Sequence, residues 1–480
     1  MIMRKLFISV LTLVVLSAPD MSAKTPKTEK SKADTTTTQE EKKQTVKTGW
    51  NVAPFPSVAY NSDTGFQIGA LCELFYYGDG STYPGYMHKF NVDLSYSTGG
   101  QVKLHFFYDS KYLIPKVRLT AAATYLLNTM YPFYGFNGNM SPVNMDYNSN
   151  KENRTAFYNV RRNMLRVMAD FQGNIYKDSF RWAAGISYWY YKVQDITGEK
   201  LVGPKGKYDL VNNQVLTGNN IHSSSLYQLY QKAGLISPEE AGGGSHIELK
   251  AGVVFDNREH EADPTRGIWT EVYAYGSPDI FQGRNHYLKL AAHFRHYVPL
   301  WQDKIVFAYH AAYQGRLAGD APFYTLQNIS TLYLRQIVSD GIGSINTVRG
   351  MNYNRVVGDG YAWANFEMRF KLVSFKFIKQ NWYLATNPFF DMGACVQPYR
   401  LSEMQQIRKT HRSLDGTQVL TDNEVGLIYT GEKEKLHMSA GFGVKLVMNR
   451  NFILSAEFAF PFLQEQDGKF GTNIGLNYIF

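Results

Sequence analysis

Residues 437–460 read HMSAGFGVKLVMNRNFILSAEFAF, and apolar side chains occupy every second position in both halves of this stretch. In the first half the apolar series runs from Met438 to Leu446, and small or polar residues such as Ser439 and Lys445 stand between its members. A period of two residues is typical of a β-strand with one apolar face. The stretch therefore predicts two consecutive strands.

The same alternation recurs along the chain from residue 53 to the end. Its segments predict a membrane-spanning barrel, because an even number of antiparallel strands suits a bacterial single-chain barrel. We count sixteen strands: 53–60, 65–76, 87–97, 101–110, 115–126, 155–172, 180–194, 246–256, 267–276, 285–298, 303–316, 360–371, 383–396, 435–447, 452–461 and 470–480. The fold class is thus all-β, a 16-stranded antiparallel transmembrane β-barrel with long extracellular loops.

The lengths of the connections support a closed barrel. The long gaps are 127–154, 195–245, 317–359 and 397–434, which are connections 5, 7, 11 and 13. All are odd, so all lie at one end, and every even connection is short. Transmembrane barrels have short periplasmic turns and long extracellular loops.

The composition agrees with an outer-membrane barrel. Aromatic residues make up 15% of the chain and there are 40 glycines. The longest apolar stretch, from Leu6 to Ala18, is shorter than the ~20 residues that a spanning helix needs. A barrel crosses the membrane without such a stretch.

The charges and motifs exclude several functions. Lys and Arg number 50 against 41 Asp and Glu, a net charge of +9, without the basic stripe of a nucleic-acid protein. The two cysteines, Cys72 on the lipid face and Cys395 on the lumenal face, point opposite ways and should stay unpaired. The chain contains no H-E-x-x-H, G-x-S-x-G or P-loop motif. We predict no enzyme activity, no metal, no cofactor and no nucleic-acid partner.

The two ends of the chain carry export and assembly signals. Residues 1–23 read as a signal peptide, with Arg4 and Lys5 before an apolar core. Residues 24–49 are polar and predict a disordered periplasmic tether, so the barrel should occupy 50–480. The last strand ends on Tyr478 and Phe480, an aromatic ending that assembly machinery reads in outer-membrane barrels.

One polar constellation lies in the long loop before the strand 360–371. Arg349 and Gly350 stand between glycine-rich segments that allow the backbone to fold back. The strand alternation places Glu367 and Asp391 on neighbouring strands, facing the lumen. An arginine on a loop folded inward would bond them as a bidentate donor; on spacing alone, a solvated loop arginine explains the motif equally well.

Two motifs carry a family resemblance. Val348-Arg349-Gly350, followed by Glu367 and Phe390-Asp391-Met392-Gly393, resembles the barrel signature of the BamA/TamA superfamily, or bacterial surface antigen family. Its sixth extracellular loop carries a V-R-G-aromatic tip whose arginine meets a lumenal acid; here Met351 replaces the aromatic residue. The family's D-x-R…P-x-x-G periplasmic turn is similar to Asp256, Arg258, Pro264 and Gly267, which fall on connection 8.

The resemblance implies an outer-membrane protein that assists assembly, insertion or surface translocation of other outer-membrane proteins. Its implied partners are other outer-membrane or periplasmic assembly proteins, within outer-membrane lipid and lipopolysaccharide. The family's insertases carry periplasmic polypeptide-transport-associated domains of about 75 residues each, and residues 24–49 are too few for one. Two alternatives remain open: a passive pore or solute channel, and a structural accessory barrel of an outer-membrane complex.

Overall fold

The structure is a computed structural model. It describes residues 46–83, 85–144, 157–196, 200–203, 206–209, 225–278, 286–331, 341–377, 380–450 and 452–476. The predicted signal peptide and most of the predicted tether lie outside the described residues. The predicted assembly signal, Tyr478 and Phe480, lies outside them as well.

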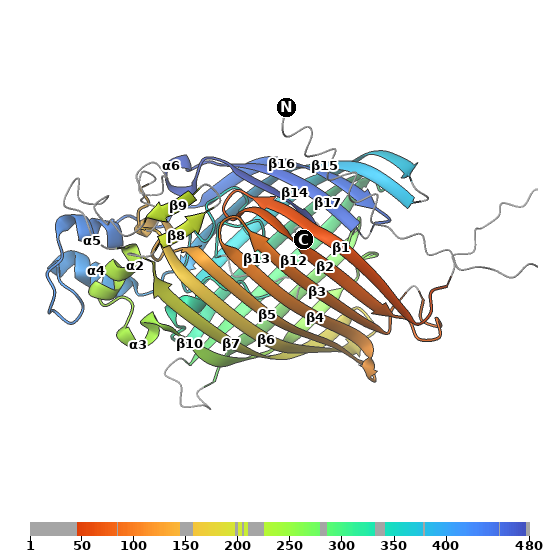
Figure 1. The fold of residues 1–480 in the computed structure, drawn as a ribbon, viewed down its shortest axis with the longest axis horizontal. Coiled ribbons are helices and arrows are strands. Elements are labelled where there is room, and N and C mark those ends of the chain that lie inside the picture. The colour runs from red at the N-terminus through yellow and green to blue at the C-terminus, as the bar shows by residue number, and fades with distance from the viewer. Residues whose placement is uncertain are drawn as a thin grey trace, which may run out of the picture.

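Sixteen strands close into one antiparallel barrel, as predicted (Figure 1). Each strand pairs with its neighbours in chain order, and β1 closes the ring against β18. A separate two-stranded sheet, β8 (Lys200–Gly203) with β9 (Gly206–Asp209), lies in the connection after β7. The barrel strands are β1 (Trp50–Asn61), β2 (Gly65–Tyr76), β3 (His88–Ser97), β4 (Gln101–Ile114), β5 (Val117–Pro132), β6 (Asn159–Tyr176), β7 (Phe180–Asp195), β10 (Gly243–Asp256), β11 (Gly267–Ser277), β12 (Tyr287–Trp301), β13 (Ile305–Gly319), β14 (Gly360–Phe377), β15 (Gln380–Gln397), β16 (His437–Met448), β17 (Phe452–Pro461) and β18 (Gly471–Leu476).

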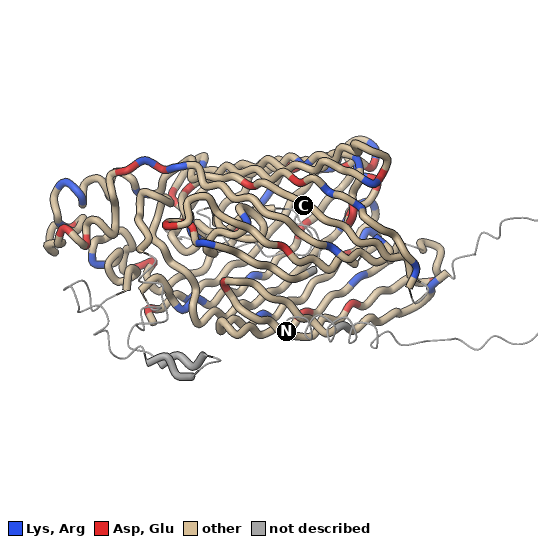
Figure 2. Tube along the Cα trace, turned by 90° about the horizontal axis from the view of Figure 1, so that it is seen from above, with Lys and Arg blue, Asp and Glu red and all other residues tan. Residues whose placement is uncertain are grey.

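The strands turn their apolar faces outward and their polar faces inward. In β16, Phe442 is 47% exposed and Val444 41%, whereas Ser439 is 0% and Lys445 1% exposed. A soluble sheet would show the reverse pattern, and lipid-facing apolar side chains are the mark of a membrane barrel. Figure 2 shows that basic and acidic residues are interspersed along the barrel. Cys72 and Cys395 are both free.

The long odd-numbered connections gather at one end of the barrel, on the left of Figure 1. They carry the short helices η1 (Gly138–Met140), α2 (Leu226–Lys232), α3 (Pro238–Ala241), η7 (Phe323–Thr325), α4 (Leu401–Thr410) and α5 (Asp422–Ile428), and the shorter connection between β17 and β18 adds α6 (Gln464–Asp467). We call this assembly of connections the extracellular cap, because long loops of such barrels lie outside the cell. Among the described residues, no helix has the length and apolarity to cross a membrane.

The cap is a packed body with its own apolar core. Phe136, from the connection after β5, makes edge-on ring contacts with Tyr230 of α2 and with Tyr399, at centroid distances of 5.1 and 4.9 Å. Lys232 and Glu424 join α2 to α5 through an ion pair of 2.6 Å. The three connections therefore cover the outer end of the barrel as one unit.

The seam between β1 and β18 has few described backbone pairs. Within the described residues, β1 pairs with β18 at Tyr60↔Ile474 and Asn61↔Asn473. On its other side β1 pairs with β2 over its whole length, from Trp50 to Asn61. Pro54 and Pro56 also stand in β1, and proline cannot donate to a ladder.

Candidate functional site

The connection between β13 and β14 folds back into the barrel and brings Arg349 inside. Gly341, Gly343 and Gly350 have φ of 57°, 113° and 85°, values that favour glycine. The backbones of Ile342 and Val356 pair across the base of this segment. We call residues 341–357 the lumenal loop.

Arg349 is bound on every side by lumenal groups. Its Nε and Nη2 donate to the two carboxylate oxygens of Asp391 at 2.6 and 2.7 Å, a bidentate pair. Its backbone N–H donates to Asp391 Oδ2 at 3.1 Å, and its Nη1 donates to Glu367 Oε1 at 2.7 Å. The guanidinium carbon lies 3.4 Å from the ring centroid of Phe389, so charge pairing and stacking act together.

The charges around Arg349 balance. Glu457 of β17 lies 3.4 Å from Arg349 Nη1 and accepts from Lys445 Nζ at 2.8 Å. Arg369 Nε donates to Glu367 Oε2 at 2.9 Å. Three cations therefore face three carboxylates, and every side chain of the set is at most 6% exposed. We call this set the latch cluster; its members are Arg349, Arg369, Lys445, Glu367, Asp391 and Glu457.

Glycines let the lumenal loop approach the wall and the seam. A Cβ on Gly350 would lie 2.7 Å from Ala459 Cβ and 2.9 Å from the Ala459 carbonyl carbon. A Cβ on Gly471, the first residue of β18, would lie 2.4 Å from Gly350 Cα. Gly393 leaves similar room, because its Cβ would lie 3.0 Å from Val348 Cγ2. The loop therefore rests directly on the last two strands.

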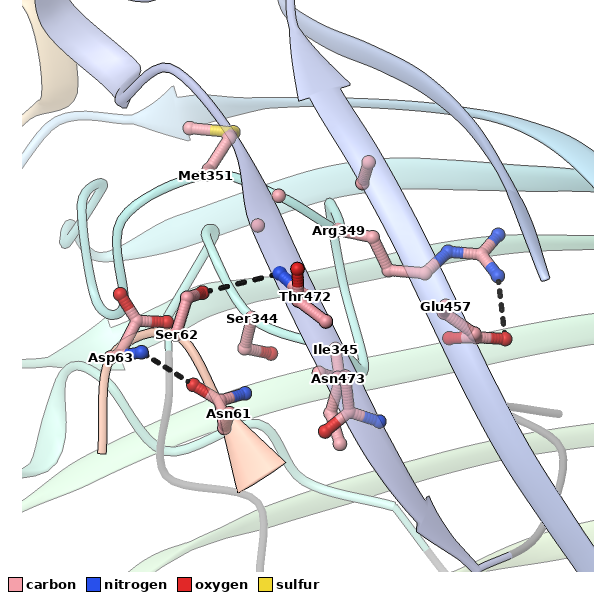
Figure 3. Close-up of a pocket in the computed structure, with 13 residues that line it drawn as sticks. Asn61, Ser62, Asp63, Ser344, Ile345, Arg349, Met351, Glu457, Thr472 and Asn473 are labelled. Atoms are coloured by element: carbon pink, nitrogen blue, oxygen red, sulfur yellow. Dashed lines mark hydrogen bonds and ion pairs between the residues drawn. The ribbon is translucent and has the colours of Figure 1, made fainter. Parts of the chain in front are cut away.

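A small pocket remains between the lumenal loop and the seam (Figure 3). It is lined by Asn61–Asp63 at the end of β1, by Gly471–Asn473 of β18 and by Arg349–Met351. Ser62 N–H donates to Thr472 O at 3.0 Å and so closes the seam next to this pocket. The latch cluster and the seam therefore lie side by side around this pocket.

A second buried cluster anchors the same loop to the cap. Arg355 is 1% exposed and donates from Nη1 to Gly138 O at 3.1 Å and from Nε to Gln466 O at 2.8 Å. Asp467 lies 3.8 Å from Arg355 Nε and 2.8 Å from His437 Nδ1. The connections after β5, β13 and β17 therefore meet around one guanidinium.

The predicted periplasmic turn is also built around an ion pair. Arg258 donates from Nε and Nη2 to the carboxylate of Asp256 at 2.9 and 3.0 Å, and its guanidinium carbon lies 4.1 Å from the ring centroid of Trp269. Gly267 has a φ of 108°, and a Cβ there would lie 2.8 Å from Arg258 Cα. Pro264 is buried in the turn.

The structure brings Arg349, Gly350, Glu367, Asp391 and Gly393 together, and places Asp256, Arg258, Pro264 and Gly267 at the opposite end. Sequence reasoning missed Glu457 and Lys445, although both stand on lumenal positions of the alternating strands quoted above. It also missed Phe389, Arg355 and His437. Arg355 and His437 meet through irregular connections, whose sequence carries no periodic signal.

The ion pairs of the latch cluster join the lumenal loop to the inner wall of the barrel. The carboxylates of the cluster are neutralised by arginine and lysine, and such pairs hold segments in register. In the part of the chain that the structure describes, no group of three or more His, Cys, Asp or Glu residues is placed to hold a metal ion.

Comparisons with known proteins agree with this architecture. A family model described as the Omp85 superfamily domain matches residues 85–478. No curated protein matches the chain. Among solved structures, BamA from Haemophilus ducreyi lacking POTRA domains 1-3 is 13% identical, with a TM-score of 0.51, over 90% of this chain and 71% of that one. CdiB from Escherichia coli is 8% identical, with a TM-score of 0.48, over 89% of this chain and 63% of that one. The likeness to BamA shows the fold.

Proposed function

Because the chain belongs to the Omp85 superfamily and forms an outer-membrane barrel, we propose that it assists the assembly, insertion or surface translocation of other outer-membrane proteins. It acts with partner subunits, namely other outer-membrane or periplasmic assembly proteins, and in contact with outer-membrane lipid and lipopolysaccharide. The proposal assigns the protein no catalytic step.

The observation that carries this proposal is the contact between the lumenal loop and the seam. Gly350 follows the latched Arg349, and its backbone lies against Gly471 of β18. In the described residues β18 meets β1 at two pairs, Tyr60↔Ile474 and Asn61↔Asn473. A strand edge that opens at this seam would bind an extended segment of another chain, and the braced lumenal loop stands directly beside it.

The packed ends of the barrel disfavour a passive pore. The cap covers the outer end with an aromatic core, and the latch cluster holds the lumenal loop inside the barrel. A solute channel needs a water-filled lumen. Steady ion conductance of the purified wild-type barrel in planar bilayers would therefore favour the channel over the present proposal.

Depletion of the protein in its own bacterium tests the function. We expect the abundance of other outer-membrane barrels to fall while their synthesis continues, and detergent-solubilised protein to co-purify with assembly factors. An unchanged outer-membrane proteome after depletion would contradict the proposal, because an accessory or solute-conducting barrel leaves other barrels in place.

A further inference from the structure

The turn between β10 and β11 crosses the mouth of the barrel at the end opposite the cap. We call residues 257–266 the periplasmic strap. Its Glu261 lies 3.6 Å from Arg118 of β5, and its Asp263 accepts a hydrogen bond from Tyr383 of β15 at 2.7 Å. In the ring of sixteen strands β5 and β15 are eight steps apart in either direction, so the strap contacts opposite walls.

The two ends of the strap differ in how firmly they are held. At the base, Arg258 is bidentate to Asp256 and stacks on Trp269, which Arg295 covers from a centroid distance of 4.0 Å. This base is part of the wall. The contact of Glu261 with Arg118 is long, and the Glu261 side chain is 58% exposed. The strap is therefore rigid where it leaves the wall and weakly held on the β5 side.

Arg450 fastens the strap on the side of β15. This residue stands in the turn between β16 and β17, and its Nη2 donates to Asp263 O at 2.7 Å and to Glu259 Oε1 at 3.2 Å. Its Nε donates to Asp263 Oδ2 at 3.2 Å. Asp263 is 4% and Thr265 5% exposed, so the strap is packed against the wall on this side.

A tight hairpin turn between β16 and β17 carries Arg450. Asn449 and Arg450 have φ of 50° and 61°, in the left-handed region that glycine or asparagine usually occupies in tight turns. Asn449 contacts Gln380 and Asn381 at the start of β15. Arg450 extends from the same turn to Glu259 and Asp263 of the strap.

We propose that the periplasmic strap is a hinged gate that closes the inner mouth of the resting barrel, with the Arg450–Asp263–Glu259 contact as its release point. Opening breaks the bonds of Arg450 and the Tyr383 hydrogen bond, while Asp256, Arg258 and Trp269 stay in the wall as the hinge. The gate controls entry to the lumen from the periplasm whichever cargo the barrel handles, so its test needs no client protein.

A single lumenal cysteine reports on the gate. Ser455 of β17 is 3% exposed, faces the lumen and lies beyond the turn that carries Arg450. In a background with Cys72→Ala and Cys395→Ala, we would place Ser455→Cys and measure its rate of modification by a membrane-impermeant maleimide in lipid nanodiscs. Arg450→Ala should raise this rate about tenfold, the change in open population that about 1.4 kcal/mol produces.

The matched control is Arg266→Ala. Arg266 belongs to the same strap, but its ion pair does not reach across the mouth of the barrel. Arg266 pairs with Asp303 of the neighbouring turn at 3.5 Å, and its side chain is 64% exposed. Arg266→Ala should leave the rate within about twofold of the parent. Equal labelling rates in parent and Arg450→Ala barrels, both folded by gel mobility, would overturn the gate. Should Arg450→Ala fail to fold, Glu259→Gln replaces it in the same comparison, since it removes one charge and keeps the size.

Discussion

Arg349 Nε and Asp391 Oδ2 lie 2.6 Å apart, and both side chains are at most 2% exposed. This pair joins a loop residue to the middle of β15 across 42 residues of chain. It holds Gly350 against Ala459 and Gly471, and thereby connects the lumenal loop to the strands that close the barrel.

Removing Arg349 should destabilise the folded barrel strongly. Arg349→Ala leaves Asp391, Glu367 and Glu457 with one cation fewer, and breaking a buried pair in this way costs about 3–5 kcal/mol. Arg349→Lys should recover little of this, because lysine cannot make the bidentate contact. Denaturant unfolding in lipid, followed by heat-dependent gel mobility, measures the loss. Arg412→Ala, an exposed arginine of the cap, is the control and should change stability by less than about 0.5 kcal/mol. Equal midpoints for the two alanine variants would mean that the latch cluster contributes nothing to stability.

Gly350→Ala should displace the lumenal loop. The new methyl group would meet the backbone of Ala459 at 2.9 Å, at a φ of 85°. Gly416→Ala is matched in φ, at 74°, but has no atom within 4 Å of the new Cβ. Gly416→Ala therefore measures only the cost of an alanine at positive φ, about 1–2 kcal/mol of unfolding free energy. Gly350→Ala should cost about 1–3 kcal/mol more, because its methyl group also overpacks against Ala459. Thermal unfolding of both variants gives this difference directly, and no difference between them would contradict the close approach of loop and seam.

How far the sequence predicts this structure depends on whether a feature follows the strand period. The alternation in 437–460 defines lumenal and lipid faces, and the same rule placed Glu367 and Asp391 inside the barrel. The alternation also places Glu457 inside the barrel, but its contact with Arg349 was not predicted. The meeting of Arg355 with Asp467, and that of Arg450 with Asp263, join connections far apart in the chain. No local period encodes such contacts, so they emerge only in the folded structure.

Asp467→Asn should loosen the cap. Asp467 is fully buried between His437 and Arg355, and the substitution removes the charge that both partners face. We expect limited trypsin digestion of intact cells to cleave the connection that carries α4 several-fold faster, because local opening exposes it. Asp422→Asn, at a side chain that is 97% exposed, is the control. Indistinguishable digestion of the two variants would show that this cluster does not hold the cap.

Acidification should release the periplasmic strap. Burial raises the pKa of Glu259, but hydrogen bonds from Thr265 and Arg266 outweigh burial, so the pKa lies below the ordinary value of a glutamate, 4.5. Because the pKa of Glu259 is lowered, the stabilisation that its carboxylate gives the strap is fully present above pH 4.5. This stabilisation is lost as the pH falls through the pKa that Glu259 has in the folded state. Burial lowers the pKa of Arg450 and the nearby carboxylates reverse this, so Arg450 stays charged throughout.

Spin labels on the strap and on β14 measure this release. With labels at Ala262 and Lys376, the distance distribution should be narrow at pH 7 and should broaden as the pH falls through the pKa of Glu259 in the folded state. Glu259→Gln should be broad at every pH, since its strap lacks the titrating charge. A narrow distribution for Glu259→Gln at pH 7 would show that the Glu259 contact does not hold the strap.

Complementation of a depletion strain tests most directly the claim that the latched loop serves assembly of other outer-membrane proteins. Chromosomal expression is shut off, plasmid copies of the wild type, Arg349→Ala or Arg412→Ala are induced, and outer-membrane barrels are quantified by mass spectrometry. The account predicts that Arg412→Ala restores their levels, whereas Arg349→Ala reaches the membrane with heat-modifiable mobility and does not restore them. Full restoration by Arg349→Ala, at equal amounts of folded protein, would contradict it.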